Sequence, residues 1–498
     1  MKMKNFPLLF AFFALIFTSC SKDDEILEQN LTSTNPEETE GTNENTELEV
    51  EDFIYAGMNE IYLYKADVPV LADEYFATED EKFDFLAGFT SPENLFESLK
   101  SNSDRFSFMT DDYEALEDRF NGVSSSTAGM EFGLGRISGT NNLFGYLQYV
   151  IPNTSAAEAG LTRGTVFTEI NGQKMTLNNI QSLLDNDSFT INIGKVEDGT
   201  LVLTDKTASL SQSSYTENPV HLVKTLDLNG KKVGYLMYNS FIANFDDELN
   251  LAFAELKSQG VTELVLDLRY NGGGNVETAI DLASMITGQF NGQVFMREQW
   301  NEEYQAYFEA NEPERLTQLF DNTIRNGQVI NSLNLSKVYV LTTESTASAS
   351  ELIINGLEPY IDVVQIGEAT TGKFQASVTL YDSEDFSKKG VNKNHTYALQ
   401  PLVLKSANVN GKSDYVDGLF PDVEISENIS NLGTLGDPEE PFLKVALNHI
   451  QGITISAATS AQQKSKEDNL KILGDGDMFE PDYQRMYLDK VPDILRRK

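Results

Sequence analysis

The 498-residue sequence contains one cysteine, Cys20, three histidines and a single tryptophan. With one cysteine no disulfide can form within the chain, so its stability must come from packing. Basic residues are also scarce, with 37 against 77 acidic residues and a net charge of −40. A chain this anionic repels nucleic acid and anionic lipid, so neither is an expected partner.

Long hydrophobic runs are almost absent as well. The apolar run from Phe6 to Phe17 follows two lysines and ends at small residues before Cys20. It is too short to span a bilayer as a stable helix and has the order of a signal peptide. The tripeptide before Cys20 resembles a bacterial lipobox, which implies that residues 1–19 are removed and that Cys20 is lipidated. The alternative is an ordinary secretory signal with an incidental cysteine.

The segments that follow Cys20 differ in composition and in the spacing of their apolar residues. Residues 21–52 carry twelve carboxylates and one lysine, a composition that favours a solvated, disordered tether over residues 20–52. Residues 53–125 show apolar positions at three- and four-residue spacing, which predicts a helical N-terminal domain. The pattern then changes near Gly129 to short strands.

Residues 126–210 predict a small α+β domain. A small-residue helix from Ser155 to Ala159 ends at Gly160, and an Asn-Gly pair makes a tight hairpin turn. On the residues alone, the glycines need only make turns. The string "IPNTSAAEAGLTRGTVFTEING" closely resembles the core of a PDZ domain, which implies that a peptide adds as a strand to a sheet edge. The resemblance also implies a loop whose backbone N–H groups bind the C-terminal carboxylate of that peptide, at Phe132, Gly133, Leu134 and Gly135.

Residues 211–430 alternate strands with helices, a pattern that predicts an α/β layer with much parallel pairing. Residues 289–335 have no clean period and are interpreted as an insertion, and residues 431–498 as a C-terminal helical extension. Three loops follow strands of the layer: "RYNGGGN", "ESTASAS" and "GEATTGKF". Because ligands bind beyond the carboxyl ends of such strands, we expect these loops to converge.

The second loop holds three serines. Ala347 and Ala349 flank Ser348 and permit close approach of a substrate backbone, and the N–H of Ala349 would be a free first-turn donor facing an oxyanion. Ser350 lies about 200° around the helix from Ser348, so the two side chains point in different directions. Ser345 stands before the helix as a candidate N-cap. Helix capping is the alternative for all three serines.

The first and third loops supply the other candidates. The first loop would expose the backbone N–H groups of Gly272, Gly273 and Gly274 and form a concavity that binds an anion. A phosphate-binding loop is the competing interpretation, but the lysine and the hydroxyl residue that such a loop requires are not found after the glycines. Lys373 would need its pKa lowered from about 10.4 to about 7–8 to act as a base, and a surface lysine is the alternative. A histidine base would have to be His221, His395 or His449, none of which adjoins a glycine-rich strand end.

In this order and spacing, "LVLDLRYNGGG", "STASASEL" and "GEATTGKF" resemble the C-terminal processing peptidases, or tail-specific proteases. The similarity runs from Phe53 to about Glu424. It implies a PDZ domain beside an α/β catalytic core of the ClpP/crotonase-like fold, and a serine endopeptidase that needs no cofactor or metal. By position in these motifs, Ser348 is the nucleophile and Lys373 the base, and the oxyanion hole uses Ala349 with Gly272 or Gly273.

The match departs from the family beyond the lysine. The glutamine often found four residues after it is replaced here by Ser377, while Gln375 comes two residues after Lys373. In an extended segment these three residues share one face, so Gln375 or Ser377 could orient the lysine.

The sequence therefore predicts an endopeptidase anchored by lipid in the cell envelope, at the outer membrane with a periplasmic or surface orientation. Its expected partners are protein or peptide substrates captured by their C-terminal tails. Two alternatives stay open: a catalytically silent, PDZ-containing peptide-binding lipoprotein, and a histidine-dependent peptidase of the tricorn type.

Overall fold

The computed structural model describes residues 48–453 and 470–497. Within them, no helix has the length and apolar character required to cross a membrane. The predicted signal peptide, Cys20 and most of the predicted tether lie outside the described residues. Helix α1 (Glu49–Ile61) begins four positions before residue 53. Its first turn carries Glu49, Glu51 and Asp52, and carboxylates are favourable at the positive end of a helix.

Helices dominate the chain as far as residue 120. After α1 come α2 (Glu79–Leu86), α3 (Pro92–Ser98) and α4 (Tyr113–Phe120), each started by a capping side chain, from Thr78, Ser91 and Asp112 respectively. The short strand β1 (Phe108–Thr110) pairs with β21 (Ala398–Gln400), which also pairs with β20 (Leu380–Tyr381). This three-stranded sheet joins the helical region to the second half of the chain.

An eight-stranded sheet follows in the order β24-β3-β4-β5-β8-β6-β7, with β9 paired to β8. A two-stranded ribbon of β2 (Val123–Thr127) and β10 (Ser213–Thr216) leads into and out of it. The elements between are β3 (Met130–Ile137), β4 (Leu143–Val150), α5 (Ser155–Glu158), β5 (Val166–Phe167), β6 (Glu169–Ile170), β7 (Gln173–Lys174), α6 (Ile180–Leu184), β8 (Ser188–Glu197) and β9 (Thr200–Ser211).

The segment expected to be a carboxylate-binding loop is a strand instead. Phe132, Gly133, Leu134 and Gly135 all lie within β3, which is paired with β4 on one side and β24 on the other. The two glycines serve packing, because a Cβ on Gly133 would lie 2.3 Å from the Tyr146 ring and one on Gly135 would lie 2.2 Å from the Phe144 ring. The loop prediction was therefore wrong for these four residues.

The central sheet has the order β11-β12-β13-β17-β18-β23. Its pairs are parallel except β11 with β12, as the alternation of strands and helices predicts. The strands are β11 (Val220–Leu228), β12 (Lys231–Tyr238), β13 (Glu263–Asp267), β17 (Lys337–Thr342), β18 (Asp362–Gly367) and β23 (Val423–Glu424).

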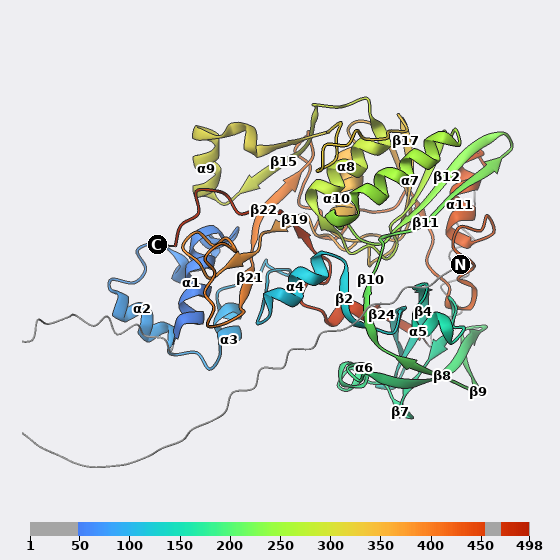
Figure 1. Ribbon diagram of the computed structural model, residues 1–498, viewed down its shortest axis with the longest axis horizontal. Helices are drawn as coiled ribbons and strands as arrows, with labels where there is room; N and C mark the ends of the chain where they lie inside the picture. Colours follow the sequence, from blue (N-terminus) through green and yellow to red (C-terminus); the bar gives the residue numbers. More distant parts are fainter. Residues whose placement is uncertain (1–47, 454–469, 498) are drawn as a thin grey trace, which may run out of the picture. The chain divides into compact units, whose positions relative to one another are not determined.

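Both faces of this sheet are covered. Helices α7 (Asp246–Ser258), α8 (Val276–Thr287) and α10 (Ala349–Leu357) lie side by side on one face (Figure 1), where Leu264 and Leu266 join their apolar cluster. Helix α11 (Pro441–Ile450) packs on the other face against Val265. A strand buried on both faces reads as a continuous apolar run, as in "ELVLD".

A second six-stranded sheet has the order β14-β25-β19-β22-β15-β16. Its strands are β14 (Gly274–Asn275), β15 (Val294–Trp300), β16 (Thr317–Leu319), β19 (Gln375–Ser377), β22 (Leu402–Ala407) and β25 (Met486–Tyr487). The expected insertion at 289–335 thus supplies β15 and β16 to this sheet, with α9 (Glu302–Asn311) between them.

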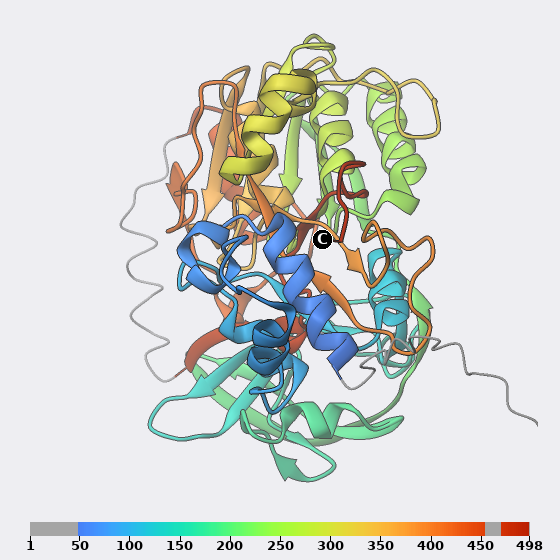
Figure 2. The ribbon, with the colours of Figure 1, turned by 90° about the vertical axis from the view of Figure 1, so that its left-hand side faces the viewer.

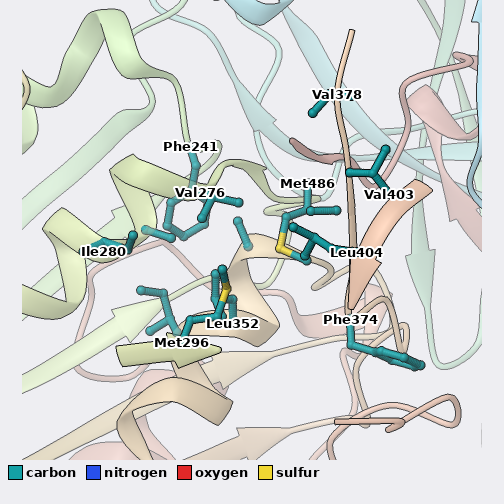
Figure 3. Packing of buried hydrophobic residues seen from close by; sticks show 14 of the residues in the cluster. Phe241, Val276, Ile280, Met296, Leu352, Phe374, Val378, Val403, Leu404 and Met486 are labelled. Carbon is teal, nitrogen blue, oxygen red and sulfur yellow. The ribbon is translucent and has the colours of Figure 1, made fainter. Parts of the chain in front are cut away.

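The C-terminal region is only partly helical. Beyond α11, the described residues form β24 (Leu470–Asp475), the short 3-10 helix η7 (Gly476–Phe479) and β25, where a helical extension was expected. Met486 of β25 is fully buried among Phe241, Val276 and Leu404 (Figure 3). The chain ends beside α1 (Figure 2), where Arg497 pairs with Asp52 at 2.6 Å. These strands return to the core because they bury side chains there, an interaction that no local sequence period records.

Candidate active site

The three loops singled out in the sequence meet at one edge of the central sheet. Strands β13, β17 and β18 are parallel neighbours, so their carboxyl ends lie together. The N–H of Ala347 donates to the carbonyl of Asn271 at 3.1 Å, and the N–H of Thr371 donates to the carbonyl of Thr346 at 3.0 Å. The serine loop is therefore bonded to the glycine loop on one side and to the lysine loop on the other.

Ser348 occupies the N-cap position of α10 in a strained conformation. Its φ is 67° and its ψ is −115°, a region that residues other than glycine rarely adopt and that occurs at functional sites. The residue is fully buried. Within the part of the chain that the structure describes, the Ser348 Oγ has no hydrogen-bond partner. A buried hydroxyl held in a strained turn without a partner is available for chemistry.

The other two serines are used structurally. Ser350 Oγ donates to the carbonyl of Asn271 at 3.1 Å, which helps to hold the glycine loop. Ser345 is three positions before the N-cap, so it does not cap α10, and its side chain hydrogen-bonds to Asp475. The structure thus separates Ser348 from both neighbours, as the helical geometry predicts for Ser350.

Glu351 joins the serine to the lysine. Its Oε2 accepts from the N–H of Ser348 at 2.7 Å and from the N–H of Lys373 at 2.9 Å. Its Oε1 accepts from the N–H of Gly372 at 2.7 Å and from Thr370 Oγ1 at 2.5 Å. Because one oxygen binds both backbone nitrogens, the two residues are direct neighbours in space. Burial raises the pKa of Glu351, and these hydrogen bonds act in the opposite direction.

Sequence reasoning missed Glu351, although a signal for it exists. A serine at a helix start followed three residues later by glutamate is the capping-box pattern. In this protein the glutamate does reach back to the N–H of Ser348, but it also binds the lysine loop.

Lys373 is buried, with 2% of its surface exposed. Burial is the main cause that lowers the pKa of Lys373 to about 7, and the cation Arg485 lowers it further, while Asp104 and Glu351 oppose the change. The ammonium nitrogen stands 4.9 Å from the centre of the Phe106 ring. About half of such lysines are neutral at pH 7, which is the state a general base requires.

The two residues expected to support the lysine differ in their contacts. Ser377 Oγ donates to the carbonyl of Met486 at 3.2 Å, so it serves the pairing of β19 with β25. Gln375 Nε2 donates to the hydroxyl of Tyr64 at 2.8 Å. Among the described residues, the buried Gln375 Oε1 has no hydrogen-bond partner. Gln375 therefore keeps the free acceptor, and Tyr64 of the helical region, which sequence reasoning missed, orients its amide.

The glycine turn lies in contact with Ser348. Gly273 has a φ of 106°, and a Cβ there would lie 2.7 Å from the Ser348 Cβ and 2.3 Å from the carbonyl oxygen of Arg485. Its N–H donates to Asn271 Oδ1 at 2.8 Å, and the N–H of Gly274 donates to the Arg485 carbonyl at 2.7 Å. The structure places Ala349 in the first turn of α10, beside this turn.

The end of the chain covers this region. Gln484 Nε2 donates to Thr371 Oγ1 at 2.9 Å, and the Gln484 backbone nitrogen lies 3.4 Å from the position of a Cβ on Gly272. A cavity of about 500 Å³ borders the same turn, and its lining includes Gly272, Gly273, Phe132 of β3 and Asp475 of β24. Ser348 and Lys373 do not line this cavity. In this structure the end of the chain therefore covers Ser348 and Lys373, and both residues are buried from solvent.

None of the three histidines contacts these loops through a partner that the structure describes. His395 Nε2 lies 3.0 Å from Asp382 Oδ2 and its ring stacks on Phe53. His221 packs on Tyr149 and His449 on Tyr339. The geometry gives no support to a histidine base.

Comparison with known proteins agrees with this geometry. Residues 232–398 match Peptidase family S41, and residues 49–108 match the Peptidase S41 N-terminal domain. A carboxyl-terminal-processing protease of Picosynechococcus is 29% identical over 168 residues, which cover 34% of this chain and 35% of the relative. A probable CtpA-like serine protease of Staphylococcus epidermidis is 24% identical over 276 residues, covering 55% and 49%. The chain thus spans about a third to a half of the length of these curated relatives.

A solved structure extends the similarity to most of the chain. A Bacteroides fragilis protein assigned to the S41 proteases is 28% identical, with a TM-score of 0.64. The superposition covers 81% of this chain and 98% of that protein. Ser348 stands directly before α10, and both Ser348 and Lys373 lie inside the matched residues 232–398. Two segments of the chain, residues 49–108 and 232–398, are thus similar to peptidase family S41, and the fold is that of an S41 protease.

Proposed function

We propose that the protein is a serine endopeptidase that cleaves protein or peptide substrates through an acyl-enzyme, with Ser348 as nucleophile and Lys373 as general base. The observation that carries this proposal is the carboxylate of Glu351, whose Oε2 binds the backbone N–H groups of both residues. Because this carboxylate binds both backbone N–H groups, it holds the backbone of Ser348 next to the backbone of Lys373. The lowered pKa of Lys373, to about 7, supplies a base with the right protonation state.

The reaction begins when neutral Lys373 accepts the proton of Ser348 Oγ as that oxygen attacks a peptide carbonyl carbon. The tetrahedral oxyanion receives hydrogen bonds from the N–H of Ala349 and from the N–H of Gly272, because the N–H of Gly273 already donates to Asn271 Oδ1. Lys373 then gives its proton to the leaving amine, the C–N bond breaks, and an ester to Ser348 remains. Water attacks this ester with Lys373 again as base, which releases the acid and restores the serine.

The folds of the two flanking units support finer assignments. The eight-stranded sheet with α5 and α6 is proposed to be PDZ-like, and the layer of α7, α8 and α10 on the central sheet to be ClpP/crotonase-like. A PDZ-like unit would bind a substrate tail as an added strand on β3, since the other side of β3 is paired with β4. The substrates are accordingly proteins or peptides with an extended C-terminal tail.

We further propose that Cys20 is lipidated and anchors the enzyme in the cell envelope through the acidic tether. The support is the order of charged, apolar and small residues before Cys20. Expression of the full chain should place the protein in the membrane fraction. Cys20→Ser should move it to the soluble fraction, whereas membrane retention of that variant would refute the anchor.

The catalytic proposal is tested by the turnover of an unfolded protein. Residues 21–498, Ser348→Ala and Lys373→Ala are compared at equal concentration, with Ser336→Ala, an exposed serine just before β17, as the control. We expect degradation by the first protein and by the control, and none by the other two. Equal turnover by all four would refute the assignment, and degradation by none of them would favour a silent binding protein.

A further inference from the structure

The edge of β3 that does not pair with β4 is occupied by another segment of the same chain. Strand β24 pairs antiparallel with β3, from Leu470 opposite Ile137 to Asp475 opposite Gly133. It is the first strand of the eight-stranded sheet, so without it β3 would be the edge. The surface on which a substrate tail would add as a strand is therefore filled in this structure (Figure 1).

Side chains of this segment fill the adjoining apolar surface. Leu473, Met478 and Phe479 pack against the cluster that contains Phe132 of β3 and Leu183 of α6. Gly476 passes so close that a Cβ there would lie 2.8 Å from the Phe132 ring. The segment therefore uses the same two features that a bound peptide would use, the strand edge and an apolar surface between β3 and a helix.

The direction of the segment is also that of a bound tail. Because β24 is antiparallel to β3, its C-terminal end points toward the start of β3. At that end Asp475 supplies a carboxylate, which accepts from Gln148 Nε2 at 2.7 Å and from the Tyr483 hydroxyl at 3.2 Å. A side-chain carboxylate thus lies where a tail of the same polarity would bring its terminal carboxylate.

We propose that residues 470–479, here called the strap, are a resident intramolecular ligand of the β3 edge, so that a substrate tail binds only after displacing them. This inference rests on the proposed capture of tails by the PDZ-like unit. The strap would then set a threshold for substrate entry, because a tail must compete with a segment of the same chain. Segments tethered in this way act at effective concentrations in the millimolar range.

The strap can dissociate from β3 while the core stays folded. Lys471 and Ile472 are exposed, and the register of the pairing with β3 shifts between Ile472 and Gly474. The next segment is different, since Met486 is fully buried and β25 pairs with both β14 and β19 (Figure 3). The apolar anchor at Met486 thus holds the end of the chain while residues 470–479 exchange with a tail.

Charge also weakens the docking of the strap. Glu131 of β3 faces Asp475 and Asp477 of the strap and also Glu217. Two nearby cations, Arg119 and Arg485, form ion pairs with Asp482 at 2.9 Å instead of with these carboxylates. Burial and these neighbouring carboxylates raise the pKa of Glu131, so docking the strap costs either charge repulsion or the uptake of a proton, and apolar contacts and strand pairing must outweigh that cost.

The strap is coupled to the catalytic loops. Asp475 bonds to Tyr483, and the following residue, Gln484, bonds to Thr371 two positions before Lys373. The strap also lines the cavity that borders Gly272 and Gly273. Its displacement therefore enlarges the space beside the glycine turn.

The test uses a disulfide that locks the strap on β3. Residues 21–498 contain no cysteine, so Arg136→Cys with Lys471→Cys introduces a single pair, at positions directly opposite each other in the two strands. The matched control is Thr190→Cys with Ser209→Cys, opposite each other in β8 and β9. The probe is a fluorescein-labelled peptide of the strap's own sequence, LKILGDGDMF, and its binding is followed by fluorescence anisotropy.

A second protein releases the strap by removing its apolar contacts. Leu473→Ala with Met478→Ala should raise the affinity for the probe at least about tenfold, which corresponds to about 1.4 kcal/mol. Ile472→Ala is its control, because Ile472 is 42% exposed and should leave affinity unchanged. The oxidised lock should bind the probe at least about tenfold more weakly than its reduced form, and oxidation of the control pair should change nothing.

The outcomes separate the two proposals. Equal binding by the oxidised and reduced lock, or by the released protein and the parent, would overturn the strap. Labelling of Ser348 by a fluorophosphonate in the released protein reports the catalytic site independently. If Ser348 is labelled but the probe binds no form of the protein, the strap is refuted and the peptidase assignment stands. If Ser348 is never labelled, the peptidase assignment fails whatever the probe does.

Discussion

Replacing Lys373 with methionine should stabilise the protein at neutral pH while abolishing activity. The lysine is 2% exposed, and its pKa falls from the ordinary 10.5 to about 7 in the folded chain. Between these two values the unfolded chain holds a proton on the lysine that the folded chain lacks. Unfolding therefore takes up a proton, and the stability of the parent protein rises with pH across this window.

The magnitude follows from the shift. One pKa unit corresponds to about 1.4 kcal/mol, so the burial of this ammonium destabilises the fold by about 5 kcal/mol at pH 7 and below. Methionine has a similar length and no charge, and it escapes this penalty. Over the range from pH 7 to pH 9, the free energy of unfolding of Lys373→Met should exceed that of the parent most at pH 7, and the difference should shrink by about 2 kcal/mol by pH 9.

Guanidinium unfolding at pH 7, 8 and 9, followed by tryptophan fluorescence, measures this difference. The single tryptophan, Trp300, is 6% exposed and lies in β15, which pairs with β22, the neighbour of β19. The probe thus reports on the sheet that follows Lys373. Lys412→Met, at an exposed lysine, serves as the control. A parent-to-variant difference that does not change with pH would refute the claim that Lys373 is neutral in the fold near pH 7.

Three further substitutions probe the loops around Ser348. Glu351→Gln should destabilise the protein by about 2 kcal/mol and lower kcat at least about tenfold with little change in KM, because hydrogen bonds to a carboxylate hold both Ser348 and Lys373; equal kcat for variant and parent would contradict this. Gly273→Ala should slow the fluorophosphonate labelling of Ser348 at least about tenfold, since its Cβ would lie 2.3 Å from a carbonyl oxygen; an unchanged labelling rate would show that the turn does not border the site. Arg485→Gln should move the midpoint of the rise in kcat/KM to higher pH, because this cation lowers the pKa of Lys373; a midpoint that stays or moves to lower pH would argue against it.

The central sheet could be read from the sequence because each of its strands is a local apolar run followed by a helix of regular period. This order determines that the carboxyl ends of β13, β17 and β18 share one edge, so the meeting of the glycine, serine and lysine loops was predictable. The turn of a helix separated Ser348 from Ser350, and the flanking alanines with the family motif singled out Ser348, all of which are local features of the sequence.

Contacts across long stretches of sequence were not predictable. Asp104, Phe106 and Tyr64 reach Lys373 and Gln375 from the helical region, and no local pattern records such pairings. Strand β25 contributes only Met486 and Tyr487 to the second sheet, too few residues for a period. The loop expected at residues 132–135 was wrong because the glycines there make room for the Tyr146 and Phe144 rings of β4 and do not form a turn.

The most direct test of the account is to map the adduct of a fluorophosphonate by mass spectrometry on residues 21–498. The account predicts one modified residue, Ser348, a labelling rate that rises with pH around 7, and labelling at least about a hundredfold slower in Lys373→Met. An adduct on another residue, no adduct at all, or equally fast labelling of Lys373→Met would contradict it.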